Sequence, residues 1–375
     1  MLTIIITIIT IIYVLLITSL VYGFEKIALF KLKNLAPKTR FSIVIPFRNE
    51  AENLHQLLES IKSLKYPRHL FEIIFVDDDS NDNSVEIIIR FLANARNDIK
   101  IISNERKTNS PKKDAITTAI EHAKYDWIIT TDADCKLPKY WLDSFDEFTQ
   151  QRKVKCIAAP VIYQATNSFL NRFQTLDFLS LQGATIGGFG IQKPFLCNGA
   201  NFAYKKDGFK VVNGFDGNTQ ISSGDDIFLL EKLVKQYPEE IHFLKCEQAI
   251  VTTKPQNSWK QLFAQRIRWA AKTSSYNNWF GKFTGLVVLL MNSTLIISIL
   301  LSLLGIIKGT VLFYLLFIKF NIDTLLIYKA ASFYNQKEVL KSILFSFLMY
   351  PFFSAYVAFI SLFKGYKWKN RIYKK

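Results

Sequence analysis

Long apolar runs stand at both ends of the chain and mark candidate membrane segments. The residues from Thr3 to Tyr22 carry no charge, and about 20 apolar residues in a helix are enough to cross the hydrocarbon core of a bilayer. No basic residue precedes this run and no small-residue cleavage site follows it, so we interpret it as a membrane anchor rather than a signal peptide. Two further stretches of spanning length run from Phe283 to Ile307 and from Val339 to Phe363.

A weaker apolar stretch lies between the two C-terminal runs, from Thr310 to Ala330. It contains Lys319, Asn321 and Asp323, and a charge near the centre of a bilayer is costly. The segment after the first span and the C-terminal tail are both basic, and the positive-inside rule favours placing both in the cytoplasm. Two C-terminal spans satisfy that rule and three do not. The sequence therefore favours a helix lying in the interface here, with a span packed against its neighbours as the alternative.

Strands and helices alternate in the chain from about residue 40 onward. Continuous apolar runs predict strands at 41–47, 71–78, 100–103 and 126–132. Apolar residues three and four apart predict helices at 49–64, 84–95 and 112–123. This alternation implies an α/β fold with a mainly parallel sheet covered on both faces. In such a sheet the ligand site lies at the carboxyl ends of the strands.

Aspartates follow two of the predicted strands. Asp77 and Asp78 end the second strand, and Asp132 and Asp134 follow the fourth, so we expect the two pairs to converge on one crevice. Converging carboxylates repel one another unless a cation or hydrogen-bond donors lie between them. Mg²⁺ or Mn²⁺ is the simplest such cation, because these ions prefer oxygen ligands and bind through few carboxylates together with substrate phosphates. Each pair taken singly is also explained by a polar turn.

Five short motifs follow one another along the chain. They read IPFRNE (45–50), VDDDSND (76–82), TDADC (131–135), SGDD (223–226) and QRIRW (265–269). In their order and approximate spacing the sequence resembles family 2 glycosyltransferases, over roughly residues 41–275 and in the flanking membrane helices. It is also distantly similar to cellulose and chitin synthase-type enzymes. The resemblance implies a GT-A catalytic domain, which is Rossmann-like with a mainly parallel sheet, joined to N-terminal and C-terminal transmembrane helices.

The resemblance also implies the residues that bind the donor. Asp78, with Asp77 beside it, would contact the nucleotide base, and Asp132 and Asp134 would hold the metal and the sugar diphosphate. The remaining candidates for contact with the nucleotide are Glu50, Lys112 and Lys113, although the two lysines are equally explained by a solvated helix start. Asp79 departs from the family pattern, because glycine is usual there.

The acceptor side is assigned by the same resemblance. Asp226 would be the general base, and Asp225 stands before it where the family usually has glutamate. The alternative for Asp226 is a capping acid at the start of the helix 227–234. Gln265 and Arg268 would face the diphosphate and Trp269 the acceptor.

Helical geometry can be applied to the segment that holds the QRIRW motif. If Ser258 caps a helix, then one face is apolar, formed by Trp259, Leu262, Phe263, Ile267 and Ala270. Gln265, Arg268 and Trp269 share a different face. Arg266 falls inside the apolar stripe, where we expect it to snorkel to lipid headgroups. An amphipathic helix on the membrane surface, with Trp269 as an interfacial anchor, is a compatible interpretation.

The expected domain organisation follows the hydropathy pattern. It consists of an N-terminal transmembrane helix (1–24), a basic linker (25–39), the GT-A domain (40–256), an amphipathic interface helix (257–280), a C-terminal membrane region of two or three helices (281–363) and a basic tail (364–375). Within the GT-A domain, the glycines at 187, 188 and 190 predict a flexible loop rather than a phosphate cradle.

Charge and cysteine content narrow the choice of partners and compartment. The chain has 375 residues, with 47 Lys and Arg against 31 Asp and Glu, for a formal charge of +16. This excess favours an anionic partner such as a nucleotide or a membrane surface. Nucleic acid is a poor fit, because the basic residues gather beside the membrane segments and no recognition motif occurs. The 4 cysteines and 4 histidines have neither disulfide nor zinc spacing, and a reducing compartment fits.

The family resemblance, together with the apolar and basic segments, implies a membrane-bound, metal-dependent inverting glycosyltransferase with its catalytic domain in the cytoplasm, at a bacterial inner membrane. The donor that the resemblance implies is a nucleotide-diphosphate sugar, with uridine favoured. The expected acceptor is a lipid-linked or membrane-proximal glycan in cell-surface polysaccharide synthesis. One alternative is a processive polysaccharide synthase, although two or three C-terminal spans are few for a channel. The other is a noncatalytic membrane scaffold that binds nucleotide or anionic lipid, which would not need Asp134 and Asp226 together.

Overall fold

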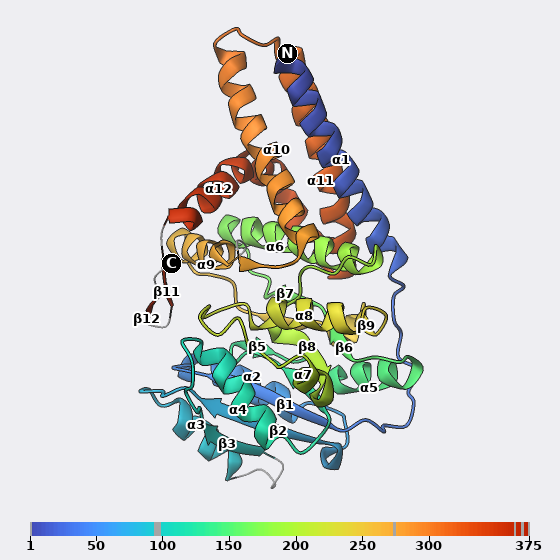
Figure 1. Cartoon of the computed structure of the whole chain (residues 1–375), viewed down its shortest axis with the longest axis vertical. Helices are drawn as coiled ribbons and strands as arrows, with labels where there is room; N and C mark the ends of the chain where they lie inside the picture. Colours follow the sequence, from blue (N-terminus) through green and yellow to red (C-terminus); the bar gives the residue numbers. More distant parts are fainter. Residues whose placement is uncertain (1, 94–98, 273–274, 364, 369–370, 374–375) are drawn as a thin grey trace. The chain divides into compact units, whose positions relative to one another are not determined.

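The computed structural model describes residues 2–93, 99–272, 275–363, 365–368 and 371–373. The chain divides into two compact units. Figure 1 labels the helices and strands that form them. The first, which we call the sheet unit, contains Ala28–Gln164 and Cys197–Lys254. The second, the helical unit, contains Met1–Ile27, Ala165–Leu196 and Pro255–Lys375. The insertion at 165–196, which the sequence pattern placed inside the catalytic domain, therefore belongs to the helical unit.

The sheet unit is built on a seven-stranded sheet with the order β3-β2-β1-β4-β8-β6-β9. Its strands are β1 (Phe41–Phe47), β2 (Phe71–Asp77), β3 (Ile99–Ser103), β4 (Trp127–Thr130), β6 (Cys156–Ala158), β8 (Phe202–Lys205) and β9 (Ile241–Phe243). Strands β3, β2, β1 and β4 are parallel, β8 is antiparallel to both neighbours, and β6 and β9 are again parallel. The prediction of a mainly parallel α/β sheet is confirmed. The last three strands have only three or four residues each, too few for a periodic signal.

The parallel register brings the ends of the central strands to one edge. Phe47 at the end of β1 pairs with Asp77 at the end of β2, which in turn pairs with Ser103 at the end of β3. Val44 of β1 pairs with Thr130 at the end of β4. The segments that leave this edge carry the acidic motifs.

A second, three-stranded sheet has the order β5-β10-β7. It contains β5 (Cys135–Lys136), β7 (Val161–Tyr163) and β10 (Val251–Thr253). Because Thr253 pairs with Cys135, this sheet holds the chain directly after Asp134 in place.

Helices cover the large sheet. They are α2 (Ala51–Lys62), α3 (Ser84–Leu92), α4 (Pro111–His122), α5 (Trp141–Gln151), α7 (Lys206–Val211) and α8 (Asp225–Gln236), with short 3-10 turns η1 (Arg68–Leu70), η2 (Gly199–Asn201) and η3 (Glu247–Ala249). The helices predicted at 49–64, 84–95 and 112–123 are α2, α3 and α4, and the predicted end of the second, residues 94–95, lies outside the described residues. The apolar stripe of α2, from Leu54 to Ile61, is buried as its period of three and four requires.

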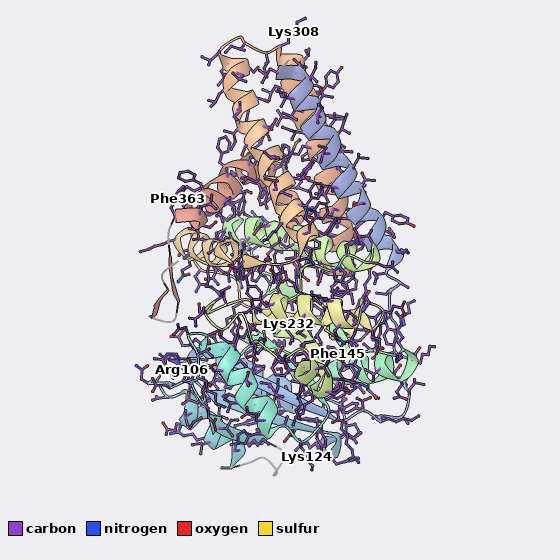
Figure 2. The ribbon with its side chains drawn as sticks, viewed as in Figure 1. Arg106, Lys124, Phe145, Lys232, Lys308 and Phe363 are labelled. Carbon is purple, nitrogen blue, oxygen red and sulfur yellow. The ribbon has the colours of Figure 1, made fainter. Side chains whose placement is uncertain are left out.

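The helical unit consists of long helices. They are α1 (Leu2–Lys26), α6 (Phe169–Gly190), α9 (Trp259–Ala271), α10 (Trp279–Leu303), α11 (Gly309–Phe333), the 3-10 turn η5 (Lys337–Ser342) and α12 (Ile343–Phe363), followed by a hairpin of β11 (Tyr366–Trp368) and β12 (Arg371–Tyr373). Four segments among the described residues are long and apolar enough to cross a membrane: Leu2–Lys26, Trp279–Leu303, Gly309–Phe333 and Lys337–Phe363. Figure 2 shows side chains projecting outward along α1 and α10. Many of the outward side chains are large and apolar, such as Ile4 and Leu303, which suits a lipid environment.

Helix α11 is a candidate span in the stretch from Thr310 to Ala330, where the sequence favoured a helix lying in the interface. It has 25 residues, as α10 does, and is long and apolar enough to cross a membrane. Its charges argued against a span, but they are paired: Lys319 forms an ion pair with Asp323, which also accepts a hydrogen bond from the Tyr13 hydroxyl of α1. Lys319 is 1% exposed. A paired and buried charge inside a helix bundle is far less costly than one facing lipid.

Helix α6 corrects the expectation of a flexible loop at the glycine cluster. Gly187 and Gly190 end this helix where it packs against α1. A Cβ added at Gly187 would lie 2.3 Å from the carbonyl oxygen of Leu20, and one added at Gly190 would lie 1.8 Å from that of Gly23. The glycines are there because only a residue without a side chain lets the two backbones approach so closely.

Candidate active site

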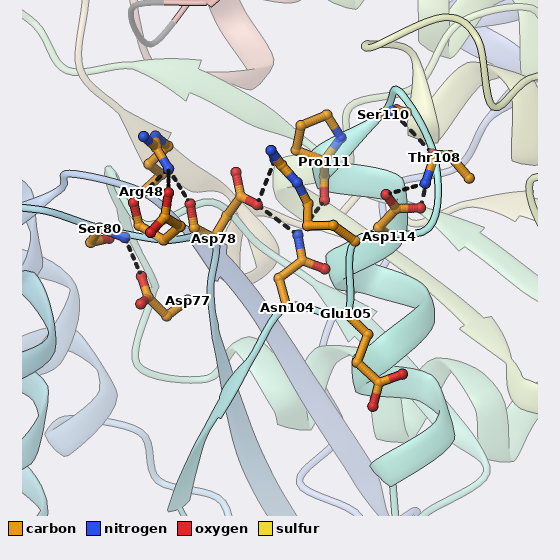
Figure 3. Close-up of polar contacts among 12 residues, drawn as sticks. Arg48, Asp77, Asp78, Ser80, Asn104, Glu105, Thr108, Ser110, Pro111 and Asp114 are labelled. Atoms are coloured by element: carbon orange, nitrogen blue, oxygen red, sulfur yellow. Dashed lines mark hydrogen bonds and ion pairs between the residues drawn. The ribbon is translucent and has the colours of Figure 1, made fainter.

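Asp78 lies at the carboxyl end of β2, where the structure surrounds it with donors. Its Oδ1 accepts hydrogen bonds from Asn104 Nδ2 at 2.7 Å and Arg106 Nη1 at 3.1 Å, and its side chain is buried. Figure 3 shows Asp78 pointing toward Asn104, which follows β3, while Asp77 turns toward Ser80. The Asp77 carboxylate accepts the Ser80 N–H at 3.1 Å. Asp77 therefore closes the local turn, and Asp78 is the acid that faces the neighbouring strand.

The turn after Asp78 explains the departure from the family pattern. Asp79 has φ of +63°, in the left-handed region where glycine is most easily accommodated and aspartate is tolerated better than most residues. Arg48 donates to the carbonyl oxygens of both Asp78 and Asp79 and lies 3.2 Å from Asp79 Oδ2. The positive φ thus accounts for the usual glycine, and the Arg48 contacts hold the turn with aspartate in its place.

Lys112, at the start of α4, lies between carboxylates from two other segments. Its ammonium is 2.7 Å from Asp132 Oδ1 and 3.4 Å from Asp225 Oδ2. Burial by itself would lower the pKa of the Lys112 ammonium, but Asp132, Asp225 and Asp226 together raise it well above its usual range. The cation that converging carboxylates require is therefore supplied, in part, by the chain itself.

Asp134 follows Asp132 in the same turn and lies next to a second acid. Burial raises the pKa of Asp134 to about 6, and the negative charges of Asp132 and Glu50 add to that effect. Glu50 accepts a hydrogen bond from Asn53, whose own side-chain oxygen accepts from Lys254 at 2.6 Å. The ionised form of Asp134 would therefore be stabilised by a divalent cation beside it.

The side chains that could bind a metal can be compared with the ligands that Mg²⁺ or Mn²⁺ prefers. No group of three or more His, Cys, Asp and Glu side chains suited to a metal is found among the described residues. Asp132 and Asp134 nevertheless supply hard carboxylate oxygens, and the charge of Asp132 is close enough to raise the pKa of Asp134. A site of this kind fits an ion that keeps waters and substrate phosphates as its other ligands, and it does not fit a closed protein cage.

Asp226 lies in the first turn of α8, two residues after Gly224, which has φ of +83°. Its Oδ2 accepts the backbone N–H of Gly199 at 2.9 Å, and its Oδ1 accepts the N–H of Ile227 at 2.8 Å. The contact with Ile227 at the start of the helix agrees with the capping interpretation, and the assignment of Asp226 as general base stays a prediction. A Cβ at Gly199 would lie 3.0 Å from Asp225 Oδ2, so a larger residue there would press against the Asp225 carboxylate.

Lys113 is placed differently from its neighbour. It is 1% exposed, and its ammonium donates to the carbonyl oxygens of Asn218 at 2.6 Å and Ile221 at 2.8 Å while it lies over the Phe228 ring. Lys113 thus anchors the segment before Asp225, and Lys112 is the lysine that reaches the acidic residues. The sequence contained both lysines but no signal for which of them turns toward the carboxylates.

The QRIRW motif lies on α9 in the helical unit. Ser258 caps this helix by accepting the N–H of Gln261, as its sequence predicts. Members of the predicted apolar stripe, including Leu262 and Phe263, pack with Phe173 of α6 and Phe353 of α12. The candidates Gln265, Arg268 and Trp269 therefore belong to the helical unit, and the candidate acids Asp77, Asp78, Asp132, Asp134, Asp225, Asp226 and Glu50 all belong to the sheet unit.

Arg266 corrects the expectation that it snorkels to lipid headgroups. Its side chain is 6% exposed and forms an ion pair with Asp177 of α6, with 2.6 Å between Nε and Oδ2. An arginine within an apolar stripe can turn inward when a buried carboxylate satisfies it. The partner was invisible to helical geometry because it lies on another helix.

Comparison with known proteins agrees with this architecture. The model of the family described as "Glycosyl transferase family 2" matches residues 42–212. The poly-beta-1,6-N-acetyl-D-glucosamine synthase of Staphylococcus epidermidis is 26% identical over 237 residues, which is 61% of this chain and 53% of that protein. The probable glycosyltransferase YdaM of Bacillus subtilis is 24% identical over 242 residues, which is 64% of this chain and 56% of that protein. The chain thus spans about half the length of these curated relatives.

A solved structure has the same fold. The mannosyltransferase PcManGT from Pyrobaculum calidifontis, in complex with GDP-Man and Mn²⁺, superposes with a TM-score of 0.58 at 15% identity, over 97% of this chain and 99% of that one. The likeness confirms the GT-A fold expected from the motifs. Over residues 42–212 this chain is thus similar to glycosyl transferase family 2.

Proposed function

We propose that this protein is a membrane-bound, metal-dependent inverting glycosyltransferase. It transfers a sugar from a nucleotide diphosphate to a lipid-linked or membrane-proximal glycan in the synthesis of a cell-surface polysaccharide. The observation that carries the proposal is the convergence of Asp132 and Asp225 on one ammonium group, Lys112. Lys112 and Asp132 lie within the stretch that matches the family 2 model. These acids come from separate segments, and a turn or a helix cap would not require them to meet.

The donor binds along the carboxyl edge of the sheet in this proposal. Asp78, held by Asn104 and Arg106, accepts hydrogen bonds from the base, and Lys112 neutralises charge on the diphosphate. Asp132 and Asp134 are the residues that would hold Mg²⁺ or Mn²⁺. When bound, the metal supplies electrostatic stabilisation of the departing nucleoside diphosphate. PcManGT, solved with GDP-Man and Mn²⁺, supports this class of donor and cation, and we favour uridine as the base.

Asp226 is the proposed general base. Its carboxylate is oriented by the Gly199 and Ile227 N–H groups and takes the proton of the acceptor hydroxyl as that oxygen bonds to the anomeric carbon. The bond to the diphosphate breaks on the opposite face, so the anomeric centre inverts. Proton removal by a positioned carboxylate contributes about 10²- to 10⁴-fold to such reactions.

Membrane attachment supports an acceptor at the membrane. The four apolar segments are long enough to cross a bilayer, and the basic residues around them favour a cytoplasmic sheet unit, as at a bacterial inner membrane.

The proposal is tested by nucleotide-sugar hydrolysis and transfer with the detergent-purified protein, across a panel of donors with Mn²⁺ or Mg²⁺. We expect Asp226→Asn to keep donor binding and lose about 10²- to 10⁴-fold in turnover, and Asp134→Ala to lose metal-dependent donor binding. The matched control is Asp216→Asn, an exposed aspartate of the same unit. Turnover by Asp226→Asn equal to that of the control would exclude the base assignment, and metal-independent binding would exclude the metal assignment.

A processive synthase is the second candidate. Relatives named poly-beta-1,6-N-acetyl-D-glucosamine synthase favour it. Product length decides between the two: a single added sugar excludes the synthase, and long chains formed at limiting enzyme exclude single transfer.

A further inference from the structure

A buried ion pair joins two helices of the helical unit. Arg266 of α9 donates through Nε to Asp177 Oδ2 at 2.6 Å, and the two side chains are 6% and 5% exposed. Burying both charges has a desolvation cost that their attraction offsets only in good geometry, and a hydrophobic pair often stabilises a fold equally well. Fold stability alone is therefore a weak explanation for an arginine in the apolar stripe of α9.

The Arg266 guanidinium also contacts two side chains of the QRIRW motif. Its Nη1 donates to Gln265 Oε1, and its Cζ lies 4.3 Å from the centroid of the Trp269 ring. One planar group therefore holds a carboxylate, an amide and an indole at once. Lysine cannot reproduce this arrangement, because its ammonium is a single point charge without a flat face or a fork of donors.

Helix α6 holds the other side of the arrangement. Asp177 also interacts with the Tyr350 side chain of α12. One turn earlier, Gln174 exchanges hydrogen bonds with the backbone of Gln256, just before α9, at 2.9 and 3.0 Å. The ring of Phe178 lies 6.2 Å from that of Trp269. The motif face of α9 is thus supported by three neighbouring residues of α6.

We propose that Arg266 and Asp177 are positioning residues for the transfer reaction. Asp177 fixes the Arg266 guanidinium, and the guanidinium fixes the Gln265 amide and the Trp269 indole in the orientation that meets the donor diphosphate and the acceptor. The inference rests on the proposed function, because those two partners are assigned by it. Small errors in the placement of such groups are costly, since orientation accounts for a large part of catalysis.

Kinetics of matched arginine variants test the proposal. We expect Arg266→Lys and Asp177→Asn to lower kcat by about 10- to 100-fold while the KM of the donor changes by less than about threefold. The control is Arg172→Lys, the same substitution on α6, where the guanidinium donates to Ser342 and Asn167 instead. We expect it to keep normal kcat. A purely structural role would lower the yield and melting temperature of the Arg266 variant and leave kcat per folded molecule unchanged.

A double-mutant cycle then shows whether Arg266 acts through the motif. In a Gln265→Ala, Trp269→Phe background, we expect Arg266→Lys to cost less than about threefold, because the groups it positions are gone. An equal loss of kcat in both backgrounds would overturn the proposal.

Tryptophan spectra decide the question without any turnover. Protein labelled with ¹⁵N-tryptophan has 6 indole groups, and Trp269→Phe identifies the signal of Trp269. We expect that signal to shift in Arg266→Lys and Asp177→Asn but not in Arg172→Lys. If the wild type binds and turns over no donor, the proposed function fails. If the wild type is active but the Trp269 signal stays in place in all variants, the positioning role fails.

Discussion

Two adjacent lysines at the start of α4 have different partners, and this separates their effects on binding and stability. The buried Lys113 donates to two backbone carbonyl oxygens, and Lys112 lies among carboxylates. We expect Lys113→Met to lower the free energy of unfolding by about 1–3 kcal/mol, because two partly buried acceptors lose their donor. We expect Lys112→Met to weaken donor binding at least about tenfold, because our proposal places the donor diphosphate beside this ammonium.

Calorimetric donor titration and denaturant unfolding of both variants measure these effects. Weaker donor binding in Lys113→Met than in Lys112→Met would show that the assignment of the two lysines is reversed.

His242 of β9 makes the sheet unit sensitive to acid. Burial lowers the pKa of His242 from its ordinary value of 6.5, and Arg152 lowers it further; the ring packs edge-on against Phe148. Below 6.5 the unfolded chain therefore binds this proton more readily than the native state does, so stability falls as pH falls through that range. Between about pH 8 and pH 5, we expect the melting temperature of His242→Gln to fall by less than that of the wild type. Parallel melting curves for the two proteins across that range would contradict the assignment.

At the scale of elements, close contact between α1 and α6 depends on glycine. A Cβ at Gly187 would lie 2.3 Å from the Leu20 carbonyl oxygen, whereas nothing lies within 4 Å of one added at Gly285 of α10. Overpacking a tight contact costs about 1–3 kcal/mol or more. We expect Gly187→Ala to lower the melting temperature of the detergent-purified protein and Gly285→Ala to leave it unchanged or raise it, since alanine favours helix. Equal melting temperatures for the two variants would show that α1 and α6 adapt to the added methyl.

Helix α12 differs from α10 and α11 in its surroundings. It contains Pro351, it runs obliquely to α10 in Figure 1, and its Phe353 and Val357 pack against α6 and α9. Because α11 has its charges paired and the basic tail favours two C-terminal crossings, we infer that α10 and α11 cross the membrane and α12 lies at its surface. The positive-inside rule still favours two C-terminal crossings. The helix that does not cross is then α12 and not α11.

At the scale of the whole molecule, the topology that we infer predicts that two sites lie on opposite sides of the membrane. Figure 2 labels Lys308 at the tip of the hairpin of α10 and α11 and Phe363 at the end of α12. We expect Lys308→Cys to react with a membrane-impermeant maleimide added to intact cells, and Gly365→Cys to react only after lysis. The background carries Cys197→Ser, because the other three cysteines are buried. Labelling of both sites on intact cells would mean that α12 crosses as well.

Local patterns in the sequence determined much of the sheet unit. The strands 41–47 and 71–78 and the helices α2, α3 and α4 followed from apolar periods, because each of these signals lies within a dozen residues or so. The order of the acidic motifs also indicated the edge of the sheet on which they lie, since parallel strands end together. The short strands β6, β8 and β9 and the helix α6 were missed, because three or four residues carry no period and glycines inside a helix resemble a loop.

Only the tertiary structure decided which partner each charged residue has. Arg266 meets Asp177, 89 positions away, and Asp323 meets Tyr13, 310 positions away. Lys112 and Lys113 are neighbours in sequence but reach different sites. Helical and strand periods predict the face of an element on which a residue lies. They do not predict which residues of other elements pack against that face. Buried charges depend on what lies opposite, because their cost in a dry interior is set by the distance to a partner. The sequence by itself therefore determined the family domain, the candidate carboxylates and the apolar segments, and the fold decided how each charge is held.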